Sequence, residues 1–186
     1  AGCGFVRQDP LPDAEALAAY YRDRYRVDYK GVAQPKVKHV WRAAELALDR
    51  FGFLGRFAAP GSRTLDVGAG GGEFVSLLSR RGYRASGIEP NRGYAEFARD
   101  TYGIDIRVGA LEDFEDDGQT HDAITLFHVL EHVVDPVQTL HALRRRLAPG
   151  GTLVVEVPNV EHLRGSPGNL FFRAHIHYFS SRTLLH

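Results

Sequence analysis

The chain has 186 residues, the length of one domain, with 44% hydrophobic and 25% charged residues, so its composition excludes disordered, collagen-like and coiled-coil chains. Its 23 basic and 23 acidic side chains give a formal net charge of zero, which argues against a dedicated nucleic-acid-binding protein. The single cysteine excludes an internal disulfide framework and favours the cytoplasm, and no signal peptide or apolar run of ~18–20 residues indicates a membrane protein.

Residues 1–34 are predicted to form an extended lead-in followed by an amino-terminal helical lid. Asp13 can cap a helix that continues to about Tyr25. The segment 20–42 is rich in basic and aromatic residues, and we expect it either to close over a site or to pack its rings onto the core. Its candidates for substrate contact are Tyr20, Tyr21, Tyr25 and Tyr29.

A second helix is predicted from Pro35 to Phe51, because apolar residues recur there at spacings of three and four. These apolar residues form one stripe along the helix. The stripe consists of Val37, Val40, Trp41, Ala44, Leu48 and Phe51.

From Arg63 onward, short apolar runs alternate with helical patterns. Alternation of this kind predicts an α/β fold in which helices cover both faces of a parallel, doubly wound sheet. Ligands of such sheets bind beyond the carboxyl ends of the strands. The predicted strands are 64–67, 83–88, 104–108, 122–127 and 152–157, and the predicted helices between them are 73–81, 91–102 and 136–147.

A glycine-rich turn follows the first of these strands, with the sequence Asp66-Val-Gly68-Ala-Gly70-Gly-Gly72. Glycines let the backbone turn tightly and aim its N–H groups at a ligand. Glu89 ends the next strand, nineteen residues after Gly70, where a carboxylate can bind both hydroxyls of a ribose. The two features together predict an adenosine-type ligand; the alternative is that Glu89 only caps the helix that begins near Asn91.

The residues of the turn favour a cationic ligand over a dinucleotide. The dinucleotide fingerprint needs glycine at its sixth position, where this chain has Glu73. Asp66 would repel a pyrophosphate but attract a ligand with an amino group and a sulfonium. No Gly-Lys-Ser/Thr closes the turn, which excludes a P-loop.

Several motifs in order resemble those of the class I S-adenosylmethionine-dependent methyltransferases, in their ubiquinone/menaquinone-type, methyltransferase type 23-like branch. The resemblance covers about residues 37–186 and implies a Rossmann-like core domain over residues 35–186, with strand order 3-2-1-4-5. It also implies S-adenosyl-L-methionine as cofactor and S-adenosyl-L-homocysteine as product. The motifs are the glycine turn, Glu89, the stretch from His121 to Pro136, Ala148-Pro-Gly-Gly151, Pro158-Asn159 and residues 175–180.

The same resemblance implies a role for ten residues at the strand ends. It assigns the methionine part of the cofactor to Asp66, Gly68 and Gly70, the ribose to Glu89, the adenine to Pro90, Asn91, Ala110 and Leu111, and the sulfonium to Phe127 and His128.

Two departures from the family pattern concern the ends of the sequence. The family sheet continues past the fifth strand with a helix and an antiparallel strand pair, which this sequence does not contain, so we expect a truncation or a partner at that edge. Cys3-Gly4-Phe5-Val6 resembles the remnant of a zinc ribbon. One cysteine cannot make a four-ligand zinc site, so we expect no metal.

Methyl transfer is an in-line displacement that needs a base only for some acceptors, and histidine is the usual base near neutral pH. His128 and His175 are the catalytic candidates. His175 resembles the base of sugar C-methyltransferases, although Phe172 and Ala174 replace the Tyr and Glu of that motif. We expect His132 to be buried and hydrogen-bonded to a loop. The His-x-His pair at 175–177 is a weak metal signal because no carboxylate or cysteine lies near it in the sequence.

The sequence therefore predicts a cytoplasmic methyltransferase that methylates oxygen or carbon of a small molecule such as a sugar, a quinone or a natural-product intermediate. We expect neither nucleic acid nor membrane as a partner, and the oligomeric state stays open. Two alternatives remain: an NAD(P)-dependent oxidoreductase domain and a non-catalytic module that binds an adenosine cofactor.

Overall fold

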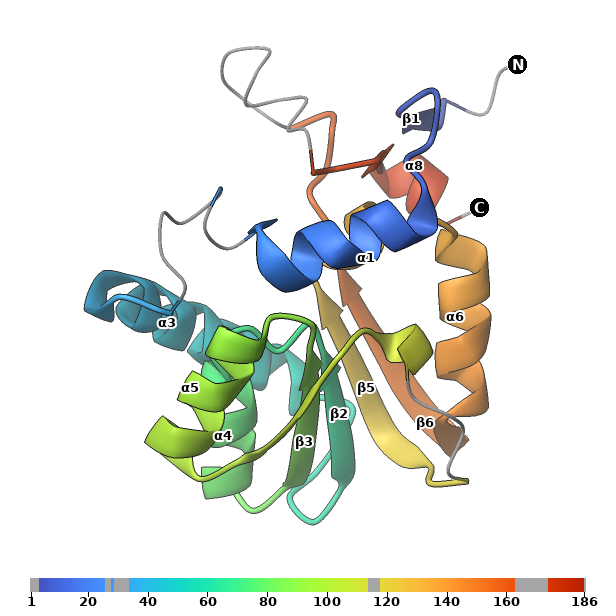
Figure 1. The fold of residues 1–186 in the computed structure, drawn as a ribbon. Helices are drawn as coiled ribbons and strands as arrows, with labels where there is room; N and C mark the ends of the chain where they lie inside the picture. Colours follow the sequence, from blue (N-terminus) through green and yellow to red (C-terminus); the bar gives the residue numbers. More distant parts are fainter. Residues whose placement is uncertain (1–3, 26–27, 29–33, 114–117, 163–173, 186) are drawn as a thin grey trace.

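The computed structural model describes residues 4–25, 28, 34–113, 118–162 and 174–185 (Figure 1). Its centre is a five-stranded sheet in which every neighbouring pair is parallel, in the order β4-β3-β2-β5-β6. This order confirms the predicted Rossmann-like arrangement 3-2-1-4-5. The strands are β2 (Arg63–Val67), β3 (Arg84–Glu89), β4 (Asp105–Val108), β5 (His121–Phe127) and β6 (Leu147–Glu156).

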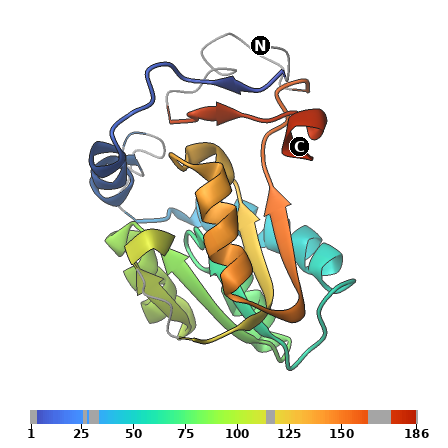
Figure 2. The same cartoon turned by 90° about the vertical axis from the view of Figure 1, so that its right-hand side faces the viewer.

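Helices cover both faces of this sheet (Figures 1 and 2). Helices α3 (Val37–Leu54), α4 (Glu73–Arg80) and α5 (Arg92–Tyr102) pack on one face, and α6 (Pro136–Arg145) packs on the other. Successive residues of a strand point to opposite faces. In β5, Ala123 accordingly joins the core under α3 and α4 while the next residue, Ile124, joins the core under α6. The predicted layers are confirmed.

Polar side chains fix the starts of three helices. The carboxylate of Asp13 accepts a hydrogen bond from the backbone of Ala16 at the start of α1 (Ala14–Asp23), at 2.9 Å. Asn91 and Asp135 cap α5 and α6 in the same way. Such caps satisfy backbone N–H groups that the first helical turn leaves without partners. The predicted capping role of Asp13 is confirmed.

The predicted helix is present as α3, but most of its apolar stripe is exposed. Val37 and Trp41 are 86% and 70% exposed, whereas Ala47 and Leu54 are buried. The reason is that only the second half of α3 packs against α4 and the sheet, so the buried face is set by that contact rather than by the densest apolar pattern.

A second, two-stranded sheet joins the two ends of the described chain. Strand β1 (Val6–Arg7) pairs antiparallel with β7 (His177–Tyr178), and the short helix α8 (Ser181–Leu184) follows (Figure 2). The backbone N–H of Gln8 donates to the carbonyl of Ile176 at 2.9 Å. The lead-in is therefore attached to the carboxyl-terminal part of the core.

Some expectations concern residues outside the described ranges. Cys3 with its zinc-ribbon resemblance, Tyr29 and Phe172 fall there. Within the described ranges, no strand follows β6 in the large sheet. Among the described helices, none combines the length and the apolar character that crossing a bilayer requires.

Candidate active site

A cavity of about 950 Å³ lies beyond the carboxyl ends of β2, β3 and β5. This volume is typical of pockets for small molecules, which measure about 300–1,000 Å³. Residues from α3, the glycine turn and the loop around residue 175 also line it. The predicted site residues that line it are Asp66, Gly68, Gly70, Glu89, Pro90, Phe127, His128 and His175.

The glycine turn is shaped by close contacts that a side chain would prevent. Gly68 has φ +79°, and a Cβ built on it would overlap Val129. Gly72 has φ +82° at the start of α4, where a Cβ would come 2.7 Å from the side chain of Ala98 on α5. Both positions favour glycine because of their positive φ and their tight surroundings.

Glu89 connects the glycine turn to the start of α5. Its side chain is 1% exposed; one carboxylate oxygen accepts from the N–H of Gly70 at 2.8 Å and the other from the N–H of Asn91 at 3.1 Å. The two carboxylate oxygens have lone pairs left for further donors. The contact with Asn91 is the one expected if Glu89 caps the start of α5. Glu89 also lines the cavity, so the two interpretations of this residue do not exclude each other.

Asp66 is a buried acid beside the cavity. It is 5% exposed, and the hydroxyl of Thr125 donates to it at 2.6 Å. Burial raises the pKa of Asp66 to about 7. A cationic group placed in the cavity would favour the ionised form of this carboxyl, so its position fits the positively charged ligand that the sequence predicts.

Three of the residues predicted to contact adenine have other contacts and do not line the cavity. The amide oxygen of Asn91 caps α5, and its amide nitrogen donates to the carbonyl of Arg22 at 2.9 Å. Leu111 is buried in the core under α6, and the N–H of Ala110 donates to the carboxylate of Asp113 at 2.7 Å. Their contacts with adenine stay predictions.

His128 follows the last residue of β5 and lines the cavity. It is a non-glycine residue with φ +57°, a strained conformation that often marks functional positions. Its Nε2 lies 2.8 Å from Glu156 and its Nδ1 lies 3.5 Å from Glu131. These carboxylates raise the pKa of His128 to about 9. Because an imidazolium cannot accept a proton, the geometry favours a hydrogen-bond donor here over the expected base.

Glu156 is the carboxylate that links His128 to α3. Arg50 binds it through two nitrogens, at 2.7 and 3.2 Å. His128 and Arg50 lower the pKa of Glu156 to about 2. The guanidinium of Arg50 also lies 4.2 Å from the centre of the Phe127 ring, so this ion pair holds one wall of the cavity.

His175 differs from His128 in its protonation. It is partly buried, and its Nε2 lies 4.0 Å from the Oε1 of Glu131. Burial and the neighbouring His132 lower the pKa of His175 to about 4. Its imidazole is therefore neutral near pH 7.

Tyr21 and His132 meet at the carbonyl of Ala174. The hydroxyl of Tyr21 donates to this carbonyl at 2.7 Å and lies 2.6 Å from Nδ1 of His132, which is itself 2.8 Å from the same carbonyl. The expected hydrogen bond of His132 to a loop is confirmed. The rings of Tyr21 and Tyr25 pack against His132 and also line the cavity. Closure of this segment over a substrate stays a prediction.

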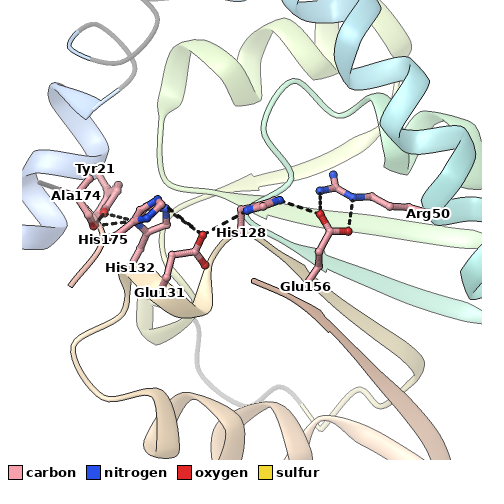
Figure 3. Close-up of polar contacts among 8 residues, drawn as sticks. All are labelled: Tyr21, Arg50, His128, Glu131, His132, Glu156, Ala174 and His175. Atoms are coloured by element: carbon pink, nitrogen blue, oxygen red, sulfur yellow. Dashed lines mark hydrogen bonds and ion pairs between the residues drawn. The ribbon is translucent and has the colours of Figure 1, made fainter. Parts of the chain in front are cut away.

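Figure 3 shows these side chains as a row that runs from Arg50 to Tyr21. Sequence reasoning missed three of its members, Arg50, Glu131 and Glu156. Two of them carried a signal: Glu131 stands three residues after His128, and Glu156 ends an apolar strand. We call Tyr21, His128, Glu131, His132 and His175 the acceptor half of the cavity, and Asp66, the glycine turn and Glu89 its cofactor half.

Comparison with known families agrees with this architecture. A family model described as a methyltransferase domain matches residues 38–186. The ubiquinone biosynthesis O-methyltransferase of Xanthomonas campestris pv. campestris (strain B100) is 37% identical over 111 residues, which are 56% of this chain and 46% of that relative. The counterpart from Hahella chejuensis (strain KCTC 2396) is 34% identical over 110 residues, again 56% and 46%. The chain thus spans about half the length of these curated relatives.

Solved structures share the fold. The plantazolicin methyltransferase BpumL, solved in complex with SAH, superposes with a TM-score of 0.65 at 15% identity, covering 88% of this chain and 68% of its own. SAM-bound CalS10, an amino pentose methyltransferase from Micromonospora echinaspora, gives a TM-score of 0.56 at 24% identity, covering 67% and 57%. At these identities the likeness concerns the fold alone.

Proposed function

Because the chain belongs to the methyltransferase domain family, we propose that it transfers a methyl group to the oxygen of a small hydroxyl-bearing molecule. One observation carries the proposal. A single cavity joins a glycine turn flanked by two buried carboxylates to a group of histidines at the same edge of the sheet.

S-adenosyl-L-methionine is the cofactor of this family and fold, and S-adenosyl-L-homocysteine is its product. When bound, the cofactor supplies a methyl group that its sulfonium has already activated. Two buried acids that line the cavity support this cofactor. We expect Asp66 to bind its ammonium and Glu89 to bind its ribose hydroxyls. Gly68 lets the backbone come close to the ligand.

The acceptor half supplies positioning. His128 is held as a cation by Glu131 and Glu156, and its Nε2 is paired with Glu156. Its Nδ1–H, 3.5 Å from Glu131, is the donor that can turn to an acceptor oxygen. His175 presents a neutral imidazole to the same space, a form that can accept a proton or bind a cation. An in-line displacement depends mainly on such alignment and on the exclusion of water.

An oxygen acceptor is favoured over a carbon acceptor by two observations. The ubiquinone-pathway relatives are O-methyltransferases by name and match more than half of this chain. The residue before His175 is Ala174, where the sugar C-methyltransferase motif has an acid. Family membership overturns the NAD(P)-dependent alternative, and Asp66 gives the physical reason, since a buried carboxylate would repel a pyrophosphate.

Calorimetric titration with S-adenosylhomocysteine tests the cofactor half. We expect micromolar binding that is lost in a variant with both Asp66→Ala and Glu89→Ala. Glu96→Gln is the matched control, because Glu96 is a half-exposed carboxylate on α5 that pairs with Arg92 and does not line the cavity. Absence of binding to the parent chain, or equal binding to the double variant, would contradict the proposal.

A methyl-transfer assay with labelled S-adenosylmethionine and a panel of phenols, catechols and sugars tests the acceptor half. Turnover on a hydroxyl compound supports the proposal. Cofactor binding with no turnover on any of them would favour the non-catalytic module instead.

A further inference from the structure

Glu131 is a buried acid whose role the cofactor site does not explain. It lies in the short helix η2 (Leu130–His132) and is 1% exposed. Among the described residues, neither of its carboxylate oxygens has a hydrogen-bond partner. A buried carboxylate without hydrogen bonds is costly. The ion pair with His128, whose Nδ1 lies 3.5 Å away, compensates its charge from one side only.

Imidazole nitrogens surround this carboxylate on several sides (Figure 3). Nε2 of His132 lies 3.8 Å from Oε1, and Nε2 of His175 lies 4.0 Å from it. The potential ligand atoms of Glu131, His132 and His175 all lie within 4.8 Å of one another. Ligands bound to one ion at about 2.0–2.2 Å are spaced by about 3–4 Å, which small ring rotations would give.

The hydrogen bonds of His132 determine which of its nitrogens can bind a cation. Nδ1 lies 2.8 Å from the carbonyl of Ala174, which can only accept, and 2.6 Å from the hydroxyl of Tyr21, whose own hydrogen is donated to the same carbonyl. Nδ1 therefore carries the hydrogen, and in the neutral ring the lone pair of Nε2 faces Glu131. A histidine that donates its other N–H to a backbone carbonyl is the usual arrangement of a metal ligand.

We propose that Glu131, His132 and His175 bind one divalent transition-metal ion of the zinc type. Two imidazoles and one carboxylate suit Zn²⁺, Co²⁺, Ni²⁺ or Fe²⁺, whereas Mg²⁺ and Ca²⁺ prefer oxygen ligands. His128 stays outside the ligand set because its Nε2 is paired with Glu156.

This site replaces the expectation, drawn from the sequence, that the chain holds no metal. The pair of histidines at 175 and 177 seemed to lack a carboxylate, but the fold brings Glu131 beside His175. All three ligands line the cavity, so the open positions of the ion face the acceptor half. A use of those positions to bind an acceptor oxygen rests on the proposed function; the ion site itself does not.

Titration of chelator-treated protein with Co²⁺, followed by visible absorption, tests the site directly. We expect one Co²⁺ ion per chain and the visible d–d absorption of an ion with a low coordination number. Zn²⁺ should displace the Co²⁺, and Mg²⁺ should not. Glu131→Gln and His175→Gln should each weaken Co²⁺ binding by more than about 100-fold. Loss of a residue that only hydrogen-bonds to a metal ligand already weakens metal binding by about 10–100-fold, and these variants remove a ligand itself. His141→Gln should bind as the parent does, since His141 is exposed on α6.

Thermal unfolding followed by circular dichroism shows whether each variant is folded. We expect the metal-free Glu131→Gln protein to remain folded, with a melting temperature that reflects only the loss of the ion pair with His128. Absence of one-to-one binding, or equal binding by folded Glu131→Gln and His175→Gln proteins, would overturn the proposal and leave Glu131 as a counter-ion of His128.

Titration of the metal-free protein with S-adenosylhomocysteine separates this proposal from the proposed function. The cofactor half contains none of the three ligands, so binding should not change when the ion is removed. Cofactor binding without metal binding would overturn only the metal site, and metal binding without cofactor binding would overturn only the methyltransferase proposal.

Discussion

The cofactor half and the acceptor half of the cavity each contain buried carboxylates, but they hold them in different ways. Glu89 accepts hydrogen bonds from two backbone N–H groups, and Asp66 accepts one from Thr125 of the adjacent strand. Within the described part of the chain, the carboxylate of Glu131 pairs only with imidazole nitrogens, at 3.5–4.0 Å. The first half is organised by the sheet itself, whereas the second depends on side chains from distant segments. A ligand should therefore alter the second half more than the first.

Glu89→Gln should have the largest effect on ligand affinity, and it tests the cofactor half alone. It removes the charge that we propose binds two ribose hydroxyls, and hydrogen bonds to charged groups contribute about 1.5–3 kcal/mol each. We expect S-adenosylhomocysteine to bind at least about 100-fold more weakly, measured by calorimetry. Glu96→Gln should bind normally; a comparable loss there would indicate a nonspecific charge effect.

His175→Gln should separate the two halves. It changes the acceptor half only, so we expect kcat/KM for the acceptor to fall about 10–100-fold, a typical effect for a group that aligns or deprotonates a substrate. The Kd for S-adenosylhomocysteine should stay within about twofold of the parent value. If that Kd rose together with the loss of turnover, the two halves would not be independent.

Asp66→Asn should reveal how much the buried carboxyl of Asp66 lowers the stability of the folded protein near neutral pH. Burial raises the pKa of Asp66 from 3.8 to about 7, so the folded protein binds this proton more tightly than the unfolded chain does. The stability that the proton confers is complete below about pH 4 and is lost as the pH rises through about 7. The asparagine variant should therefore gain stability over the parent between pH 4.5 and 8, by about 2 kcal/mol at the upper end.

Thermal melts of the two proteins across this pH range provide the measurement. A constant difference in melting temperature from pH 4.5 to 8 would show that Asp66 titrates normally. The same variant should bind S-adenosylhomocysteine less tightly. Asp66 would then contribute to ligand binding although it lowers the stability of the folded protein.

Tyr21→Phe should have the smallest effect. It removes the hydroxyl that donates to the carbonyl of Ala174, a contact worth about 1 kcal/mol. We expect a small decrease in unfolding free energy, measured by urea denaturation, and an unchanged affinity for S-adenosylhomocysteine. Tyr102→Phe on α5 is a control, and an equal decrease there would indicate a general loss of aromatic hydroxyls.

The cofactor half could be predicted from the sequence because its parts are local. The glycine turn and Glu89 stand at the ends of two adjacent strands, and apolar patterns locate those strands. The helix cap at Asp13 could be predicted for the same reason. Asn91 shows the limit of this reasoning: it stands beside the site in the sequence, but its side chain caps α5 and binds Arg22.

The acceptor half could not be predicted in the same way, because its partners are far apart in the sequence. Arg50 and Glu156 form their ion pair only when α3 packs beside the end of β6. Glu131 and His175 meet only when the loop at residue 175 returns to β5. The exposure of the apolar stripe on α3 could not be predicted for a similar reason, since the exposure of Trp41 depends on what packs against the helix and not on the helix itself.

The strand pair β1–β7 has a consequence for the order in which the molecule folds. Gln8 donates through its side chain to the carbonyl of His175, across 167 positions of the chain, whereas Gly70 and Glu89 are 19 positions apart. Closing the longer loop costs about 2 kcal/mol more chain entropy. The nucleus of the fold should therefore form around β2 and β3, and His175 should reach its final place late, when the two most distant parts of the described chain meet.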